Sequence, residues 1–192
     1  YGRLGEASTY GPLLYLIHAP ANTWFEGFRR RSTGEPYHID LERWRGEGGG
    51  YPYRDLEFPA ARTVTLCFDA LLLVGLFLIG TGDRLGKESA GERWAAVRRG
   101  LALVALAGAT PYLIATGFGG LGWESHIVPT ACTVWAFYFI IRDRTIAGGV
   151  CLGLGAGVLY YPVFLFPVWL SYAAKRDGWK SALRFVFGFS AV

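Results

Sequence analysis

An apolar run from Thr63 to Gly80 constrains this chain more than any other feature, because Asp69 is the only charged residue among its 18 residues. About 20 apolar residues of α-helix cross the hydrocarbon core of a bilayer, so the run predicts a transmembrane helix. The whole chain is 52% hydrophobic and has a mean hydropathy of +0.27. A soluble domain with an ordinary polar surface is less apolar, and we therefore expect an integral membrane protein.

Further apolar segments predict more membrane helices. We expect membrane segments at about residues 63–80, 101–118, 127–141 and 146–172, and the start of another at 181–192. Pro111 lies inside the second segment, where neighbouring helices can satisfy the carbonyl group that proline leaves free. The 27 glycines suit close helix packing in lipid. Residues 62–192 are thus expected to form an all-α, polytopic transmembrane helical bundle.

The basic residues between these segments predict the orientation of the bundle. The connection after the first segment carries five of them: Arg84, Lys87, Arg93, Arg98 and Arg99. The connection at 119–126 has no Lys or Arg, whereas Arg142 and Arg144 follow the third segment. Because cytoplasmic loops are enriched in Lys and Arg, we expect the first and third connections inside and the second outside.

The segment at 146–172 does not fit a single crossing, because basic residues follow it again at Lys175 and Arg176. Its 27 residues supply about 40 Å of helix, whereas two full crossings need about 60 Å. Tyr160-Tyr161-Pro162 is the natural break, since proline disfavours helical geometry in the residue before it. We expect a re-entrant or broken helix pair whose halves meet near the external leaflet and line a substrate cavity.

With this orientation, residues 1–61 form a long external loop. An interfacial amphipathic helix is predicted inside it from a set of apolar residues: Leu13, Leu14, Leu16, Ile17, Trp24, Phe25 and Phe28. The chain has no Met and starts in polar sequence, and its last apolar stretch begins only at Ser181. We therefore expect that the chain is truncated at both ends.

Several function classes are excluded by the pattern of charge and glycine. The net charge of +4 is spread over the connections, whereas a nucleic-acid surface needs Lys and Arg clustered on one face, so no nucleic-acid partner is expected. Gly153, Gly155 and Gly157 lie in an apolar segment without a preceding strand, which favours helix packing over phosphate binding. Cys67, Cys132 and Cys151 lack paired spacing and are interpreted as buried thiols.

Two sets of polar residues are candidates for function. Asp69 is a carboxylate inside a membrane segment, which is costly and often functional; a packing hydrogen bond or a pair with Arg62, seven residues earlier, are the structural alternatives. Glu124 and His126 lie in the external connection and could bind a divalent cation, the one cofactor that the sequence suggests. Most other acidic residues on the external side are expected to be solvated.

The order of these parts resembles the polytopic type-C glycosyltransferases, in particular the bacterial integral membrane proteins of glycosyltransferase family 87. The resemblance covers most of the chain and rests on short motifs: Tyr10-Gly11-Pro12-Leu13-Leu14-Tyr15, Ala60-Ala61-Arg62, Phe68-Asp69 and Tyr160-Tyr161-Pro162. It implies transfer of a sugar from a polyprenyl-phosphate donor at the external face of the bacterial cytoplasmic membrane.

The same resemblance implies site residues. The expected base is an acidic residue of the first external loop, and Glu6 is the residue nearest to that position. Tyr10, Glu124, His126, Tyr160 and Tyr161 are the expected substrate-binding residues. The chain departs from the family pattern at two places: Gly122-Trp123-Glu124-Ser125-His126 replaces an Asn-Asp pair, and Leu159 stands where relatives often carry a Lys.

These departures favour a second hypothesis, a non-catalytic relative that is a subunit of a larger membrane complex, for example an energy-transducing one. Its partners would be other membrane subunits as well as lipids. A transporter is a third hypothesis, because discontinuous helices also build transport sites.

Overall fold

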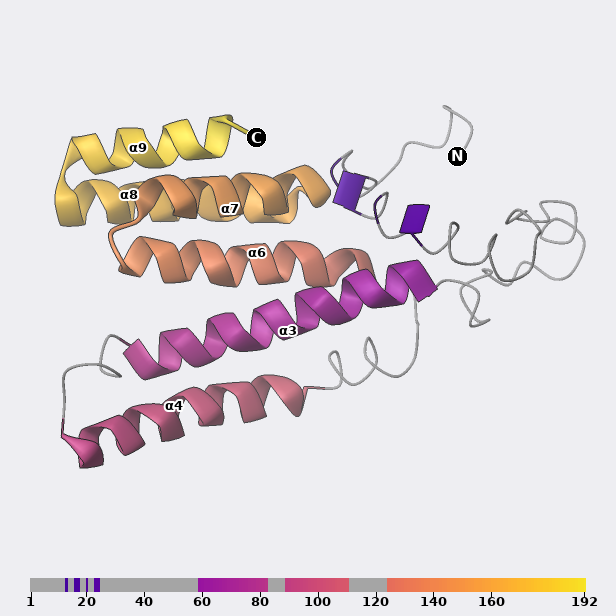
Figure 1. The fold of residues 1–192 in the computed structure, drawn as a ribbon. Coiled ribbons are helices and arrows are strands. Elements are labelled where there is room, and N and C mark those ends of the chain that lie inside the picture. Colours follow the sequence, from indigo (N-terminus) through magenta and orange to yellow (C-terminus); the bar gives the residue numbers. More distant parts are fainter. Residues whose placement is uncertain are drawn as a thin grey trace, which may run out of the picture.

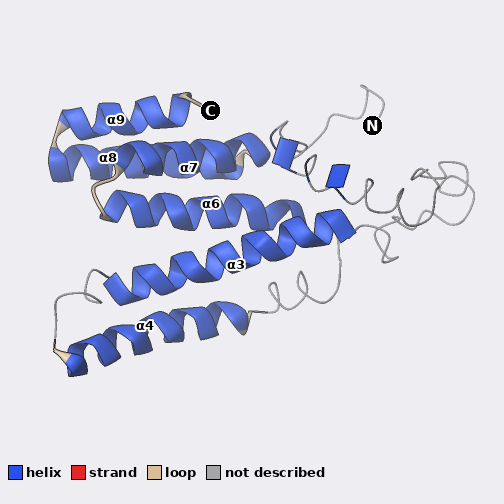
Figure 2. Ribbon diagram, in the orientation of Figure 1, coloured by secondary structure: helices blue, strands red, loops and turns tan. Residues whose placement is uncertain are grey.

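The computed structural model describes residues 59–82, 89–110 and 124–192, together with residues 13, 16, 17, 20, 23 and 24. All regular structure in this part of the chain is helical, and it contains no strand (Figure 2). The predicted all-α class is therefore confirmed for the described residues.

The helices follow one another in the order α3 (Pro59–Thr81), α4 (Ala90–Gly108), α6 (Glu124–Ile141), α7 (Thr145–Val158), a 3-10 turn η3 (Tyr161–Leu165), α8 (Phe166–Asp177) and α9 (Trp179–Ser190). In Figure 1 they lie side by side, with α4 outermost on one flank and α9 on the other. α3 packs against α4 and α6, and α7 packs against α6 and α9. The end of this arrangement that holds the α6–α7 connection and the α8–α9 turn differs in its side chains from the end that holds η3.

Helix α3 agrees with the first predicted membrane segment. Its residues Thr63–Thr81 form the one helix among the described residues that is long and apolar enough to cross a membrane by length and composition. The shorter stretches His126–Ile141 and Thr145–Val158 are apolar but fall below that length. Cys67 is exposed on α3, so its prediction as a buried thiol is wrong; it shares the uncovered face of the helix with Leu66 and Val74.

Helix α4 begins at Ala90 rather than at the predicted Leu101. Its start is fixed by a capping box, in which the Glu92 carboxylate accepts hydrogen bonds from the backbone N–H of Ser89 at 3.0 Å and from its hydroxyl at 2.9 Å. Arg93, Arg98 and Arg99 consequently lie on the first half of a helix and not in a loop. The rest of the predicted segment, from residue 111, lies outside the described residues.

Glycines let α7 and α9 approach until their backbones touch. A Cβ atom on Gly149 would collide with the carbonyl oxygen of Phe185, and one on Gly188 would collide with that of Ile146. A Cβ atom on Gly153 would lie 2.7 Å from the carbonyl oxygen of Phe189. These contacts confirm the interpretation of the glycine run as a helix-packing surface.

The predicted break is present at Tyr160-Tyr161-Pro162. α7 ends at Val158, Leu159 has extended backbone geometry, and η3 turns the chain into α8. α8 then runs in the opposite direction to α7, so that its last turn reaches the α6–α7 connection (Figure 1). There the guanidinium group of Arg176 lies 2.7 Å from the carboxylate of Asp143 and donates to the carbonyl oxygen of Ile141 at 3.0 Å.

Part of the predicted interfacial helix packs against the bundle. Residues 13, 16, 17, 20, 23 and 24 have helical geometry. Leu13 and Ile17 contact the core formed by Leu72, Ile127, Val128, Ala131, Val158 and Leu159, whereas Leu16 and Trp24 are exposed. This segment therefore joins the end of the bundle at which the broken helix turns.

Candidate functional site

The turn of the broken helix is fixed to the first turns of α6 by a pair of hydroxyl groups. The oxygen atoms of Tyr161 and Thr130 are 2.9 Å apart. Because the Thr130 hydroxyl donates its only proton to the carbonyl oxygen of His126 at 2.6 Å, Tyr161 is the donor in this pair. Two residues predicted for substrate binding, His126 and Tyr161, thus meet through Thr130, which the sequence did not single out.

The surroundings of this pair differ in exposure. Tyr160 has 67% of its surface exposed and Tyr161 38%, whereas Pro162 is fully buried. His126 is half-buried and has further interactions. On the other side of the turn, a Cβ atom on Gly157 would collide with Leu13. At this turn Pro162 is therefore packed inside the molecule, whereas the aromatic ring of Tyr160 faces outward.

The other predicted site residues are only partly covered by the structure. Glu6 and Tyr10 lie outside the described residues. Glu124 begins α6 and Arg62 belongs to α3, but the side chains of both lie outside the described part, and so does the proposed pair between Arg62 and Asp69. No group of three or more His, Cys, Asp or Glu side chains that could hold a metal ion occurs among the described residues.

Asp69 on α3 has a partly buried carboxyl group. Its Oδ1 atom is buried and has no hydrogen-bond partner within the described part of the chain. The Oγ1 atom of Thr133 on α6 is in the same condition. The packing hydrogen bond expected as one alternative for Asp69 is therefore not found for Oδ1 among the described residues. A buried polar atom without a partner reduces stability.

An apolar groove, which the sequence did not predict, runs between α3, α6 and α7. Its volume is about 310 Å³, and it is lined by Phe68, Leu71, Ala131, Cys132, Trp135, Phe139 and Cys151. The indole N–H of Trp135 donates to the carbonyl oxygen of Leu71 at 2.9 Å, which fixes one wall of the groove. Ala131 and Cys132 directly follow Thr130, so the groove begins on the same stretch of α6 as the hydroxyl pair.

Comparison with protein-family models, with curated proteins and with solved structures found no match for this chain.

Proposed function

We propose that this chain belongs to a polytopic protein of the bacterial cytoplasmic membrane that transfers a sugar from a polyprenyl-phosphate donor at the external face. The observation that carries the proposal is the hydrogen bond between Tyr161 and Thr130. It joins the first turns of α6 to the broken segment at Tyr160-Tyr161-Pro162, and that broken segment is one of the features on which the resemblance to type-C glycosyltransferases rests. Non-helical backbone inside a bilayer is tolerated where it is buried in protein or lines a cavity.

Placement of the bundle in a membrane is supported by the outward-facing apolar side chains. Only 22% of the apolar window of α3 is buried inside the molecule, which is unlike the core helix of a soluble protein. Phe164, Phe187 and Leu106 also expose most of their surface. Large apolar side chains exposed on several helices are expected where a protein contacts lipid or a partner.

The two ends of the bundle also support the proposal. Lys175 and Arg176 lie in the last turn of α8, where Arg176 contacts Asp143 of the α6–α7 connection, whereas Tyr160 lies at the opposite end. This is the arrangement expected from the positive-inside rule for a segment that enters and returns. The apolar groove beside Trp135 has the character needed for part of a polyprenyl chain.

In the proposed reaction a carboxylate, Glu6 by resemblance, takes the proton of the acceptor hydroxyl. The acceptor oxygen forms a bond to the anomeric carbon as the bond from that carbon to the donor phosphate breaks, and the polyprenyl phosphate leaves with the bonding electron pair. Glu124 and His126 would assist at the phosphate, with a divalent cation if one is needed, and Tyr160 and Tyr161 would stack on the sugar or the lipid.

Sugar transfer in isolated membranes tests the assignment of residues. Glu6→Gln and Glu124→Gln are expected to lower turnover at least about tenfold each, within the range of general-base effects. Arg144→Gln, at the opposite end, serves as the control and should retain turnover. Unchanged turnover in both Gln variants would reject these roles.

Accessibility of single cysteines tests the topology on which the proposal depends. In a chain whose three native cysteines are replaced by Ser, Lys175→Cys should react only with a reagent on the cytoplasmic side and Tyr160→Cys only on the external side. Reaction of both from one side would remove the shared external pocket.

One observation favours the alternative, a non-catalytic subunit of a larger membrane complex. Leu159, at the position where relatives often carry a Lys, is only 8% exposed and packs in the core beside Val158 and Leu72. A cation at this position would be buried among apolar side chains and could not meet a lipid phosphate. Purification from native membranes separates the two: stoichiometric partners support the subunit, and a protein that runs alone contradicts it.

A further inference from the structure

The end of the bundle opposite Tyr161 gathers basic side chains from three places in the sequence. The first half of α4, the α6–α7 connection and the α8–α9 turn all lie at the same end (Figure 1). Their exposed basic residues are Arg93, Arg98, Arg99, Arg144, Lys175, Arg176 and Lys180. The acidic residues in the described part of this end are Glu92, which caps α4, and Asp143 and Asp177, which lie next to Arg176. These three carboxylates are too few to neutralise the positive charge.

Two tryptophans mark the boundary of this basic end. Trp94, in the first turns of α4, is 68% exposed, and Trp179, the first residue of α9, is 69% exposed. Tryptophan is enriched at the level of lipid headgroups, because its ring is apolar and its N–H is polar. The positions of both residues fit that level if the bundle is inserted as proposed above.

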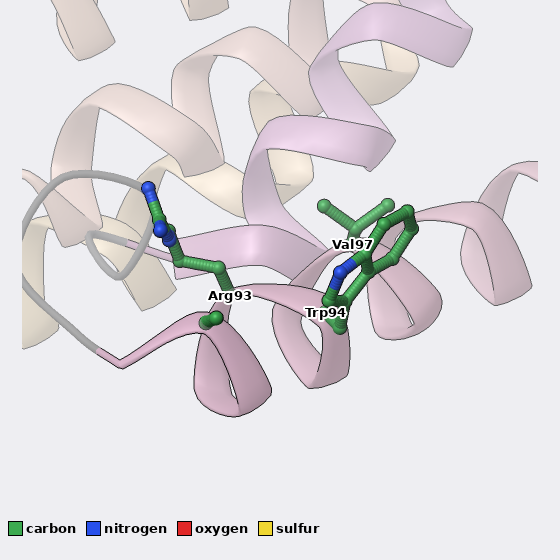
Figure 3. A pocket seen from close by; sticks show the side chains of 4 residues that line it. Arg93, Trp94 and Val97 are labelled. Atoms are coloured by element: carbon green, nitrogen blue, oxygen red, sulfur yellow. The ribbon is translucent and has the colours of Figure 1, made fainter.

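A hollow at the start of α4 combines the two features. Its volume is about 290 Å³, and its lining is Ala90, Arg93, Trp94 and Val97, all from the first two turns of one helix (Figure 3). The Glu92 carboxylate, the nearest acid in sequence, accepts from both the N–H and the hydroxyl of Ser89. The hollow thus offers one guanidinium group, one indole ring and an apolar floor, and its volume is near the lower end of the range of ligand sites.

We propose that this hollow binds the headgroup of an anionic phospholipid of the cytoplasmic leaflet, with Arg93 facing the phosphate and Trp94 packing against the glycerol and the start of the acyl chains. The proposal rests on the membrane placement of the proposed function but not on sugar transfer. Charge complementarity decides the occupant: a surface rich in Lys and Arg with exposed tryptophan matches an anionic lipid surface better than a zwitterionic one.

Lipid retention measures this preference on the full chain. The protein is reconstituted in nanodiscs with equal amounts of phosphatidylglycerol and phosphatidylcholine, and the lipids that remain bound are counted by native mass spectrometry. Wild type should retain phosphatidylglycerol in preference. Arg93→Gln should lower the enrichment about fivefold, which corresponds to about 1 kcal/mol for one basic residue near an anionic surface.

Matched variants keep the test specific to the hollow. Arg93→Lys preserves the charge and should recover most of the enrichment. Arg144→Gln removes one charge from the same end but outside the hollow, and should lower the enrichment by less than about twofold. Equal losses in Arg93→Gln and Arg144→Gln, or no preference in wild type, would overturn the proposal. A melting temperature for each variant identifies any loss that comes from unfolding.

Two further arms separate the lipid from other outcomes. If millimolar glycerol phosphate displaces the retained lipid, the hollow recognises a free phosphate and the lipid assignment is wrong. If the preference persists in a protein that shows no sugar transfer, the enzymatic proposal fails while the lipid site stands. If alkaline carbonate extracts the chain from membranes, the lipid site fails together with the membrane placement.

Discussion

The hydroxyl group of Tyr161 donates a hydrogen bond to that of Thr130 across 2.9 Å, and these residues are 31 positions apart in the chain. This contact connects the turn between α7 and α8 to α6. As a hydrogen bond between two side chains, it holds the returning chain against α6 at this end of the bundle. Removing it tests how much the candidate site depends on that return.

Tyr161→Phe removes the donor and leaves the ring in place. We expect the free energy of unfolding to fall by about 0.6–1.5 kcal/mol, the range for one hydrogen bond between helices in a membrane protein or a folded domain. Unfolding in detergent with increasing SDS fraction provides the measurement. Tyr160→Phe, at an exposed ring, should change it little, and equal losses in the two variants would contradict the role of the pair.

Gly149→Ala inserts a methyl group between α7 and α9, where a Cβ atom would collide with the carbonyl oxygen of Phe185. We expect a loss of about 1–3 kcal/mol, because neither backbone can move without separating the helices. Gly108→Ala is the matched control, since a Cβ atom there meets nothing within 4 Å. That change should be neutral or stabilising by up to about 1 kcal/mol. A Gly149→Ala protein as stable as wild type would show that α7 and α9 are not held in direct backbone contact.

Asp69→Leu replaces a partly buried carboxyl group, whose Oδ1 atom has no hydrogen-bond partner among the described residues, by an apolar side chain of similar size. Insertion of α3 should become more favourable by up to about 3–4 kcal/mol, the difference between Asp and Leu at the centre of a membrane helix. Glycosylation mapping of α3 in a reporter protein gives the insertion free energy. If sugar transfer falls although folding improves, Asp69 has a functional role; if both are maintained, it is dispensable.

Arg176→Gln breaks the contacts of the α8 end with Asp143 and with the carbonyl oxygen of Ile141. The hydrogen bond that Arg176 donates to the Tyr172 hydroxyl oxygen, together with Asp143 and Asp177, raises the pKa of Arg176. Arginine is charged throughout the physiological range in any case, so only substitution removes the charge. We expect a lower melting temperature at low salt and a smaller difference at high salt, because exposed ion pairs are screened. A double-mutant cycle with Asp143→Asn measures the coupling, and additive effects would contradict a direct pair.

Local chemistry made part of this fold predictable. The break at Pro162 could be predicted because proline acts on its own backbone and on the preceding residue, whatever surrounds them. The start of α4 was predicted too late, because hydropathy indicates where apolar sequence begins and not where a helix begins. Ser89 followed by Glu92 has the spacing of a capping box, and that signal would have placed the helix start at Ala90.

The candidate site was less predictable, because it depends on contacts between distant residues. The sequence identifies Asp69 as unusual, but only the packing of α3 leaves its Oδ1 atom buried without a partner among the described residues. The groove wall requires Trp135 to reach Leu71, 64 positions away, and no local pattern predicts which of the chain's tryptophans does so. Predictions that concern Glu6 and Tyr10 fall on residues outside the described ranges.

The hydrogen bond from Arg176 to the carbonyl oxygen of Ile141 has a consequence for biosynthesis. The donor follows its acceptor by 35 residues, so the last turn of α6 leaves the ribosome well before the side chain that completes it. Until α8 has been made and has folded back, that carbonyl group depends on solvent or on the translocation machinery for a hydrogen bond. Released chains that end before Arg176 should therefore hold the last turn of α6 less firmly than released chains that include it.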